Sequence, residues 1–171
     1  MQNRGIALAI AGALITAVAC GSTTAPAAVS KIVTFTATMT FGGEVPTPPV
    51  ASTGSGTFTA TLDTSTNVFT YDLTFTGLTA GAVAGHIHGP AAVGVNAGTT
   101  IDFKSLPGAT FSSGLTAGTG HGVATLNAAT AITTTVSGDS LKKLLFAGLT
   151  YANIHTSNNT GGEIRGQITK Q

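Results

Sequence analysis

One stretch of the sequence, KIVTFTATMTF (Lys31–Phe41), decides the fold class. Its apolar residues, from Val33 to Phe41, share one parity, and its four threonines, from Thr34 to Thr40, share the other. Successive side chains of a strand point to opposite faces, so this alternation predicts a half-buried strand with an apolar inner face. Threonine is β-branched and suits the pleated outer face.

The same alternation recurs along the chain, at Thr57–Leu62 and at Val68–Thr76, with a hairpin loop between them. One segment, Asp139–Ala147, instead carries leucines at helical spacing, with Asp139 as the expected N-cap and Gly148 at the C-terminal end. Eight or nine strands with regular turn signals predict an all-β fold, a Greek-key β-sandwich or barrel with one short helical insert near residues 139–147. The shorter predicted strands are Val83–His88, Thr99–Phe103, Gly122–Leu126, Ala131–Val136, Thr150–His155 and Glu163–Thr169.

The composition excludes several classes of protein. Only 8% of the 171 residues are charged, and seven basic residues face six acidic ones. A nucleic-acid partner is not expected, because such binders need a surplus of Lys and Arg to neutralise phosphates. A single cysteine excludes a disulfide scaffold.

The N-terminus is expected to be an export signal. Residues 1–19 carry one charge, Arg4, followed by a short apolar run that ends in small residues, which is typical of a cleaved signal peptide. The sequence around Cys20 resembles a bacterial lipobox with Ala17 in place of the usual Leu, so Cys20 is expected to be acylated. Residues 20–30 then form a flexible tether to the membrane, and residues 31–171 form the domain. The alternative is ordinary cleavage with Cys20 incidental.

The four histidines are the strongest candidates for a functional site. His86 and His88 are two residues apart on a predicted strand and therefore share a face, which suits chelation of one metal ion. His155 lies on the outer face of a later strand, and Arg165 is expected on the same outer face if the last two strands form a hairpin. The direction of His121, between two glycines, stays open. The structural alternative is that the histidines only fix loops and that Arg165 pairs with Glu163 or Asp72.

Motifs of known catalytic sites are missing from the sequence. It contains no nucleophile elbow, no phosphate loop and no dinucleotide fingerprint, and its six acidic residues offer no obvious carboxylate pair. The Pro-rich stretch Val45–Val50 is interpreted as a rigid connector.

Five short motifs follow one another along the chain: GGEVPTPPV (Gly42–Val50), GSG (Gly54–Gly56), HIHGP (His86–Pro90), NIHT (Asn153–Thr156) and GGEIRG (Gly161–Gly166). Together they resemble the CHRD (chordin-type) domain, over residues 31–171. The resemblance implies an extracellular location and a fold more than an activity, and bacterial members are exported.

The chain is also distantly similar to copper/zinc superoxide dismutase. That resemblance implies an immunoglobulin-like Greek-key barrel, with three copper ligands at His86, His88 and His155 and an anion-guiding Arg165. His121 is a tentative fourth ligand, although its order in the chain differs. The sequence lacks a zinc-loop cluster, a disulfide pair and a basic field beyond Arg165, so copper binding is expected more than dismutase activity.

Two functions remain open. The first is a non-catalytic, lipid-anchored binding module of the bacterial cell envelope, acting through an extracytoplasmic protein partner. The second is a mononuclear copper-binding protein, for storage, delivery or redox work. Metal stoichiometry discriminates between the two.

Overall fold

The structure, a computed structural model, describes residues 31–127 and 136–171. Its elements are, in chain order, β1 (Ile32–Thr40), η1 (Phe41–Gly43), β2 (Ser55–Asp63), β3 (Val68–Thr76), β4 (Ala82–His88), β5 (Thr99–Asp102), β6 (Thr110–Phe111), β7 (Gly118–Thr125), α1 (Gly138–Phe146), β8 (Tyr151–Thr156), β9 (Ile164–Gln167) and β10 (Thr169–Lys170). The expected all-β class with one short helix is confirmed.

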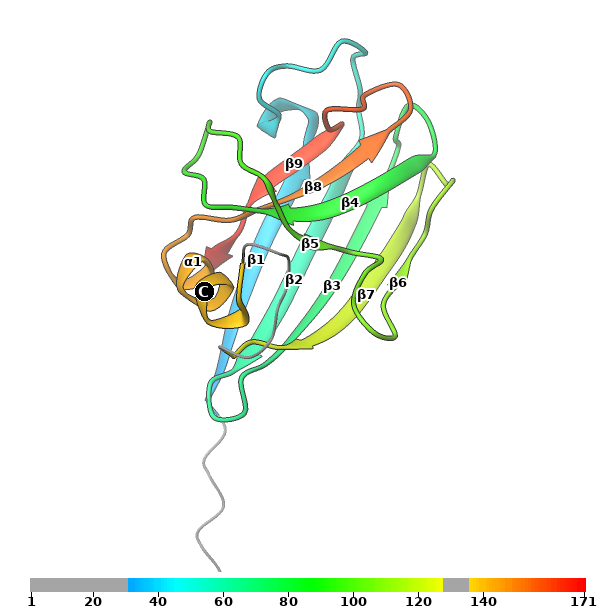
Figure 1. Cartoon of the computed structure of the whole chain (residues 1–171). Coiled ribbons are helices and arrows are strands. Elements are labelled where there is room, and N and C mark those ends of the chain that lie inside the picture. Colours follow the sequence, from blue (N-terminus) through cyan, green and yellow to red (C-terminus); the bar gives the residue numbers. More distant parts are fainter. Residues whose placement is uncertain (1–30, 128–135) are drawn as a thin grey trace, which may run out of the picture.

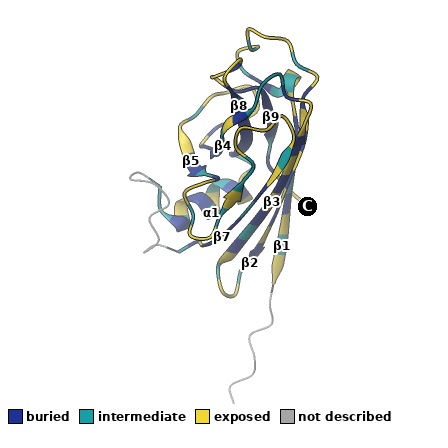
Figure 2. Cartoon of the chain, turned by 90° about the vertical axis from the view of Figure 1, so that its right-hand side faces the viewer, coloured by how far each residue is buried: buried dark blue, intermediate teal, exposed yellow. Residues whose placement is uncertain are grey.

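The described strands form one antiparallel sheet in the order β5-β4-β8-β9-β1-β2-β3-β7-β6, with β10 paired to β1. The sheet curls, so that β4 and β8 cross over the long strands β1, β2 and β3 (Figure 1). The strands β4 and β8 thus belong to one layer and β1, β2 and β3 to the other, and the buried faces of these two layers lie toward each other (Figure 2). The curled sheet therefore encloses its core as a sandwich does.

The core is built from the apolar side chains that the alternation predicts on the inner face of each strand. Phe35, Phe58 and Tyr71 have no exposed surface, and their neighbours Thr36, Thr57 and Thr59 point outward. Phe103, after β5, closes the core from the other layer, with its ring centroid 5.0 Å from that of Tyr71. Tyr71 donates its hydroxyl proton to the Phe103 carbonyl at 3.1 Å, which satisfies the one polar atom that this aromatic residue brings into the core.

The helix α1 begins one residue earlier than predicted. Ser137, not Asp139, is its N-cap, and the Ser137 hydroxyl accepts a hydrogen bond from the Ser140 amide. The expected end is confirmed: Gly148 has φ +67°, and the Leu149 amide donates to the Leu144 carbonyl as in a Schellman motif. Leu141 and Leu145 are fully buried, so the helix contributes its apolar stripe to the core.

The strand predictions agree with the observed elements within a few residues, apart from Ala131–Val136. That predicted strand falls on residues 128–135, outside the described residues, except for Val136, which is not in a strand. The signal peptide, Cys20 and the tether also lie outside the described residues. Within the described ranges, no helix is long and apolar enough to cross a membrane.

Candidate metal centre

Three histidines come together on the neighbouring strands β4 and β8. These strands pair antiparallel with Ala84 opposite His155 and His86 opposite Asn153, so His155 lies diagonally across from His86. His86 and His88 share a face, as predicted from their spacing. One ring nitrogen from each of the three imidazoles lies within 4.8 Å of the others. The pairing of β4 with β8, which the sequence analysis did not predict, brings His155 to this pair.

Backbone carbonyls fix which nitrogen of two imidazoles faces the centre. Nδ1 of His88 lies 3.0 Å from the Ala97 carbonyl, and Nδ1 of His155 lies 3.0 Å from the Thr160 carbonyl. A carbonyl only accepts, so each Nδ1 carries the proton and each Nε2 presents a lone pair. Metal-bound imidazoles are oriented in this way in proteins.

One nitrogen of the cluster is buried without a partner. Nε2 of His88 has no hydrogen bond, and the residue is only 8% exposed. Nε2 of His155, in contrast, accepts from Nδ1 of His86 at 3.0 Å. A buried polar atom without a partner requires an explanation, and a metal ligand is one.

Burial keeps the three imidazoles neutral. It lowers the pKa of His86 to about 4, with a further lowering from the charge of His155. It also lowers the pKa of His88 to about 4, against the opposing effect of the Ala97 carbonyl, and lowers the pKa of His155. Neutral imidazole is the form that binds metal. At neutral pH the three imidazoles are therefore in the binding form and need not first change from the charged to the neutral form.

The His88 ring, the Tyr151 ring and the Arg165 guanidinium form a stack beside the cluster. The Tyr151 ring lies parallel to the His88 ring, with centroids 4.8 Å apart and an interplanar angle of 8°. The Arg165 guanidinium carbon lies 3.4 Å from the Tyr151 ring centroid. The sheet order β4-β8-β9 places Tyr151 between the other two residues, so the ring has His88 on one side and a cation on the other.

Arg165 is buried rather than exposed on the outer face. It is 3% exposed, and it donates to the Asn96 side-chain oxygen and to the Val95 carbonyl, each at 2.7 Å. It forms no ion pair with Glu163 or Asp72, the two partners that the structural alternative considered. The loop between β4 and β5 therefore covers the guanidinium and occupies its donors.

Loops also bury other residues that the alternation places on the outer face. Asn153 is 2% exposed and donates to the Glu44 carboxylate, and Glu163 is fully buried. Burial raises the pKa of Glu44 to about 7, against the opposing effects of Asn153 and Arg165. Burial also disfavours the Glu163 anion, but hydrogen bonds from Ser52, Thr156 and Thr79 outweigh this and hold its pKa below the usual range.

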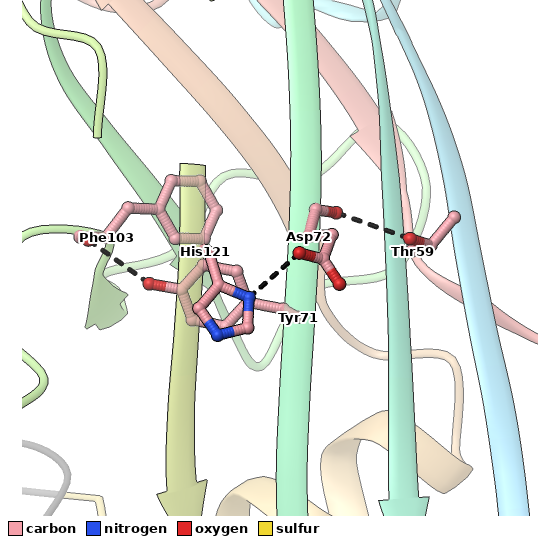
Figure 3. Close-up of polar contacts among 5 residues, drawn as sticks. All are labelled: Thr59, Tyr71, Asp72, Phe103 and His121. Carbon is pink, nitrogen blue, oxygen red and sulfur yellow. Dashed lines mark hydrogen bonds and ion pairs between the residues drawn. The ribbon is translucent and has the colours of Figure 1, made fainter. Parts of the chain in front are cut away.

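His121 does not join the cluster. It lies on β7, opposite Asp72 of β3, and its Nδ1 forms a hydrogen bond with the Asp72 carboxylate at 2.8 Å (Figure 3). On the threonine-rich face Asp72 is exposed and His121 is about half exposed, and the sheet order places β7 near the opposite end from β4. The tentative role of His121 as a fourth ligand therefore does not fit the fold.

A comparison with family models matches the CHRD domain over residues 35–168, which include every residue of the histidine cluster and its supporting stack. The chain belongs to the CHRD family. No curated protein and no solved structure matches it. The CHRD resemblance drawn from the five motifs is thereby confirmed, whereas the likeness to superoxide dismutase receives no support from these comparisons.

Sequence reasoning missed three supports of the histidine cluster. The Ala97 and Thr160 carbonyls carry no side-chain signal, because any residue supplies a carbonyl. Tyr151 could have been found only from the register that sets it opposite His88. With these supports the three nitrogens lie close enough to hold one metal ion.

Proposed function

We propose that this CHRD domain is an extracytoplasmic binding module whose ligand is one copper ion, held by His86, His88 and His155. The observation that carries the proposal is the unpartnered, buried Nε2 of His88 beside two more imidazole nitrogens, all within 4.8 Å. Membership of the CHRD family supports the wider role, since the family suggests an extracellular binding module.

Copper is favoured over other metals by the chemistry of the donors. Imidazole suits zinc, copper, iron and nickel, and among the divalent ions copper binds most tightly at a given site of this kind. The cluster offers three neutral nitrogens and, within the described residues, no carboxylate that shares it. The protein's own contribution is to orient the rings through the Ala97 and Thr160 carbonyls and to exclude water from His88.

We propose storage or delivery of copper rather than dismutase catalysis. An anion-guiding arginine must present free N–H groups to solvent near the metal. Arg165 is 3% exposed, and it uses its donors on Asn96 and Val95. The Arg165 role that the dismutase resemblance implied is therefore not part of this proposal.

We further propose that the domain is lipid-anchored in a bacterial cell envelope. The signal-like residues 1–19, the lipobox-like Cys20 and the short tether to Lys31 support this placement. Mass spectrometry of the mature protein tests it: a diacylated or triacylated Cys20 as the first residue is expected. An unmodified Cys20, or cleavage elsewhere, contradicts the anchor without affecting the metal proposal.

The metal proposal is tested by copper titration of the full chain in detergent. We expect one copper per chain, lost in His88→Ala and in His155→Ala but retained in His121→Ala. The last variant is a matched control, because it removes a histidine that lies outside the cluster. Absence of stoichiometric copper in the wild-type chain would leave the histidines structural and redirect the search to an extracytoplasmic protein partner.

A further inference from the structure

Arg165 is a buried positive charge next to the histidine cluster, and its partners are neutral. Its guanidinium nitrogens donate to an amide oxygen and to a backbone carbonyl. In residues 31–127 and 136–171, no carboxylate lies within ion-pair distance of it. A charge withdrawn from water and not paired by an anion keeps much of its electrostatic effect on its neighbours.

This charge acts on the metal ligand His88 through the Tyr151 ring. The stack places the guanidinium 3.4 Å from one side of the ring centroid and the His88 ring 4.8 Å from the centroid on the other. A guanidinium withdrawn from water at this separation disfavours a positive charge at His88 through Coulomb repulsion. A positive charge on an ion bound at Nε2 of His88 is disfavoured for the same reason.

Other charged groups lie near the cluster, and within the described residues none of them forms an ion pair with Arg165. Asp102, on β5, lies opposite His86, and Lys104 follows two residues later. Their opposite charges act against each other at His86. Of the two buried carboxyls, Glu44 binds Asn153 and Glu163 accepts hydrogen bonds from Ser52, Thr79 and Thr156, so neither forms an ion pair with Arg165. The ligands themselves are neutral, so the buried cation has no anionic ligand to offset it.

We infer that the cluster selects copper in its monovalent state. This inference rests on the proposed function and deepens it by naming the oxidation state of the ligand. The Coulomb repulsion between Arg165 and a bound ion doubles when the charge of the ion rises from +1 to +2. It therefore weakens the binding of Cu(II), Zn(II) and Ni(II) more than that of Cu(I). Among the metals that imidazole suits, copper is the one that binds in a stable monovalent form. The inference concerns equilibrium binding and requires no electron transfer by the protein.

The test compares two affinities in the same protein. The full chain in detergent is titrated with Cu(I) under anaerobic conditions, against a cuprous chelator, and with Cu(II) in air, against a cupric chelator. We expect the Kd for Cu(I) to be at least tenfold below that for Cu(II). The quantity compared is the ratio of the Kd for Cu(II) to the Kd for Cu(I). With the cation roughly 8 Å from His88 across the stack, Arg165→Met is expected to reduce this ratio about tenfold, whereas Arg165→Lys retains most of it.

The outcomes separate this inference from the proposed function. Binding of neither copper ion contradicts the proposed function itself. Tighter binding of Cu(II) than of Cu(I) by the wild-type chain overturns the inference alone, and so does an unchanged ratio in Arg165→Met. A purely structural Arg165 would lower both affinities equally, and lysine would not rescue it. If Arg165→Met does not fold, Glu44→Gln replaces it: removing this carboxyl must leave the ratio equal or higher, and a lower ratio overturns the inference.

Discussion

Nδ1 of His86 lies 3.0 Å from Nε2 of His155, across the neighbouring strands β4 and β8. Because the Thr160 carbonyl holds the proton of His155 on Nδ1, the proton shared by the two rings belongs to His86. If one metal ion is held by His86 and His155, it would take the place of that proton, and His86 would then carry its proton on Nε2. The hydrogen bond thus holds the two imidazoles close enough for both to contribute to one metal site.

Copper should therefore stabilise the fold without remodelling it. At a free copper concentration of 100 times the Kd, binding to the folded state alone adds about 2.7 kcal/mol, or roughly 8 °C in Tm for a domain of this size. We expect this gain in the wild-type chain and in His121→Ala, and none in His88→Ala, by thermal unfolding with and without copper. If His88→Ala instead lowers the Tm mainly in the presence of a chelator, the role of His88 is structural.

The Kd for copper should stay nearly constant in mild acid. Protons compete with metal only below the pKa of the ligand, and the pKa values of His86 and His88 are about 4. We expect the Kd to change little between pH 7 and about pH 5 and to rise steeply as the pH approaches 4, as measured by competition titration at constant ionic strength. A rise that begins near pH 6.5 would show ordinary, solvated histidines and contradict their burial.

The same histidines should make folding stability fall with acid. Their folded pKa values lie below the ordinary unfolded value of 6.5, so the unfolded chain takes up protons first as the pH drops. Their contribution is complete above pH 6.5 and is lost progressively toward pH 4. We expect the free energy of unfolding, from denaturant titrations of the wild-type chain, to decline across this window and to decline less in His86→Gln. Equal slopes for the two proteins would contradict the expectation.

The alternation of residues was sufficient to predict the threonine-faced strands. In β1, β2 and β3 the core covers the apolar face, and in the described part of the chain most threonines of the other face stay exposed, so each face of these strands has one environment. The same logic failed at β8 and β9, where Asn153, Glu163 and Arg165 are buried on the face predicted to be outer. Loops cover that face, and the path of a loop depends on contacts with residues distant in the sequence.

The candidate site was predictable in its ligands but not in its supports. The spacing of His86 and His88 is a local signal, and it identified a shared face correctly. Predicting the position of His155 required the register of β4 and β8, and predicting the Tyr151–Arg165 stack required the order β4-β8-β9.

At α1, the predicted N-cap Asp139 is wrong, because Ser137 also has a capping hydroxyl and lies at the residue where the chain turns into the helix.

Glu163 should be the most sensitive carboxylate of the fold. It is fully buried and accepts hydrogen bonds from the Ser52 and Thr156 hydroxyls and from both the amide and the hydroxyl of Thr79. In Glu163→Gln the new NH₂ group faces donors, so we expect a loss of about 2–3 kcal/mol in the free energy of unfolding by denaturant titration. The control Asp72→Asn removes an exposed carboxylate and should cost less than about 1 kcal/mol. Similar losses in the two variants would contradict the role of Glu163.

Gly162 should link the loop after β8 to the metal ligands. It has φ +131°, and a Cβ there would lie 2.6 Å from both the Asn153 amide nitrogen and the Glu44 carboxylate. In Gly162→Ala the loop must shift, and with it the Thr160 carbonyl that orients His155. We expect a loss of about 1–3 kcal/mol in stability and about tenfold in copper affinity, because supporting partners of ligands have effects of this size.

The neighbouring residue provides the control for this variant. A Cβ at Gly161 would meet no atom within 4 Å, so Gly161→Ala should leave both copper affinity and stability nearly unchanged. The two variants change the same loop by the same methyl group and differ only in what the methyl contacts. If both weaken copper binding equally, the loop acts through its general flexibility rather than through the Thr160–His155 hydrogen bond. If Gly162→Ala loses stability but keeps its copper affinity, this hydrogen bond does not orient the ligand.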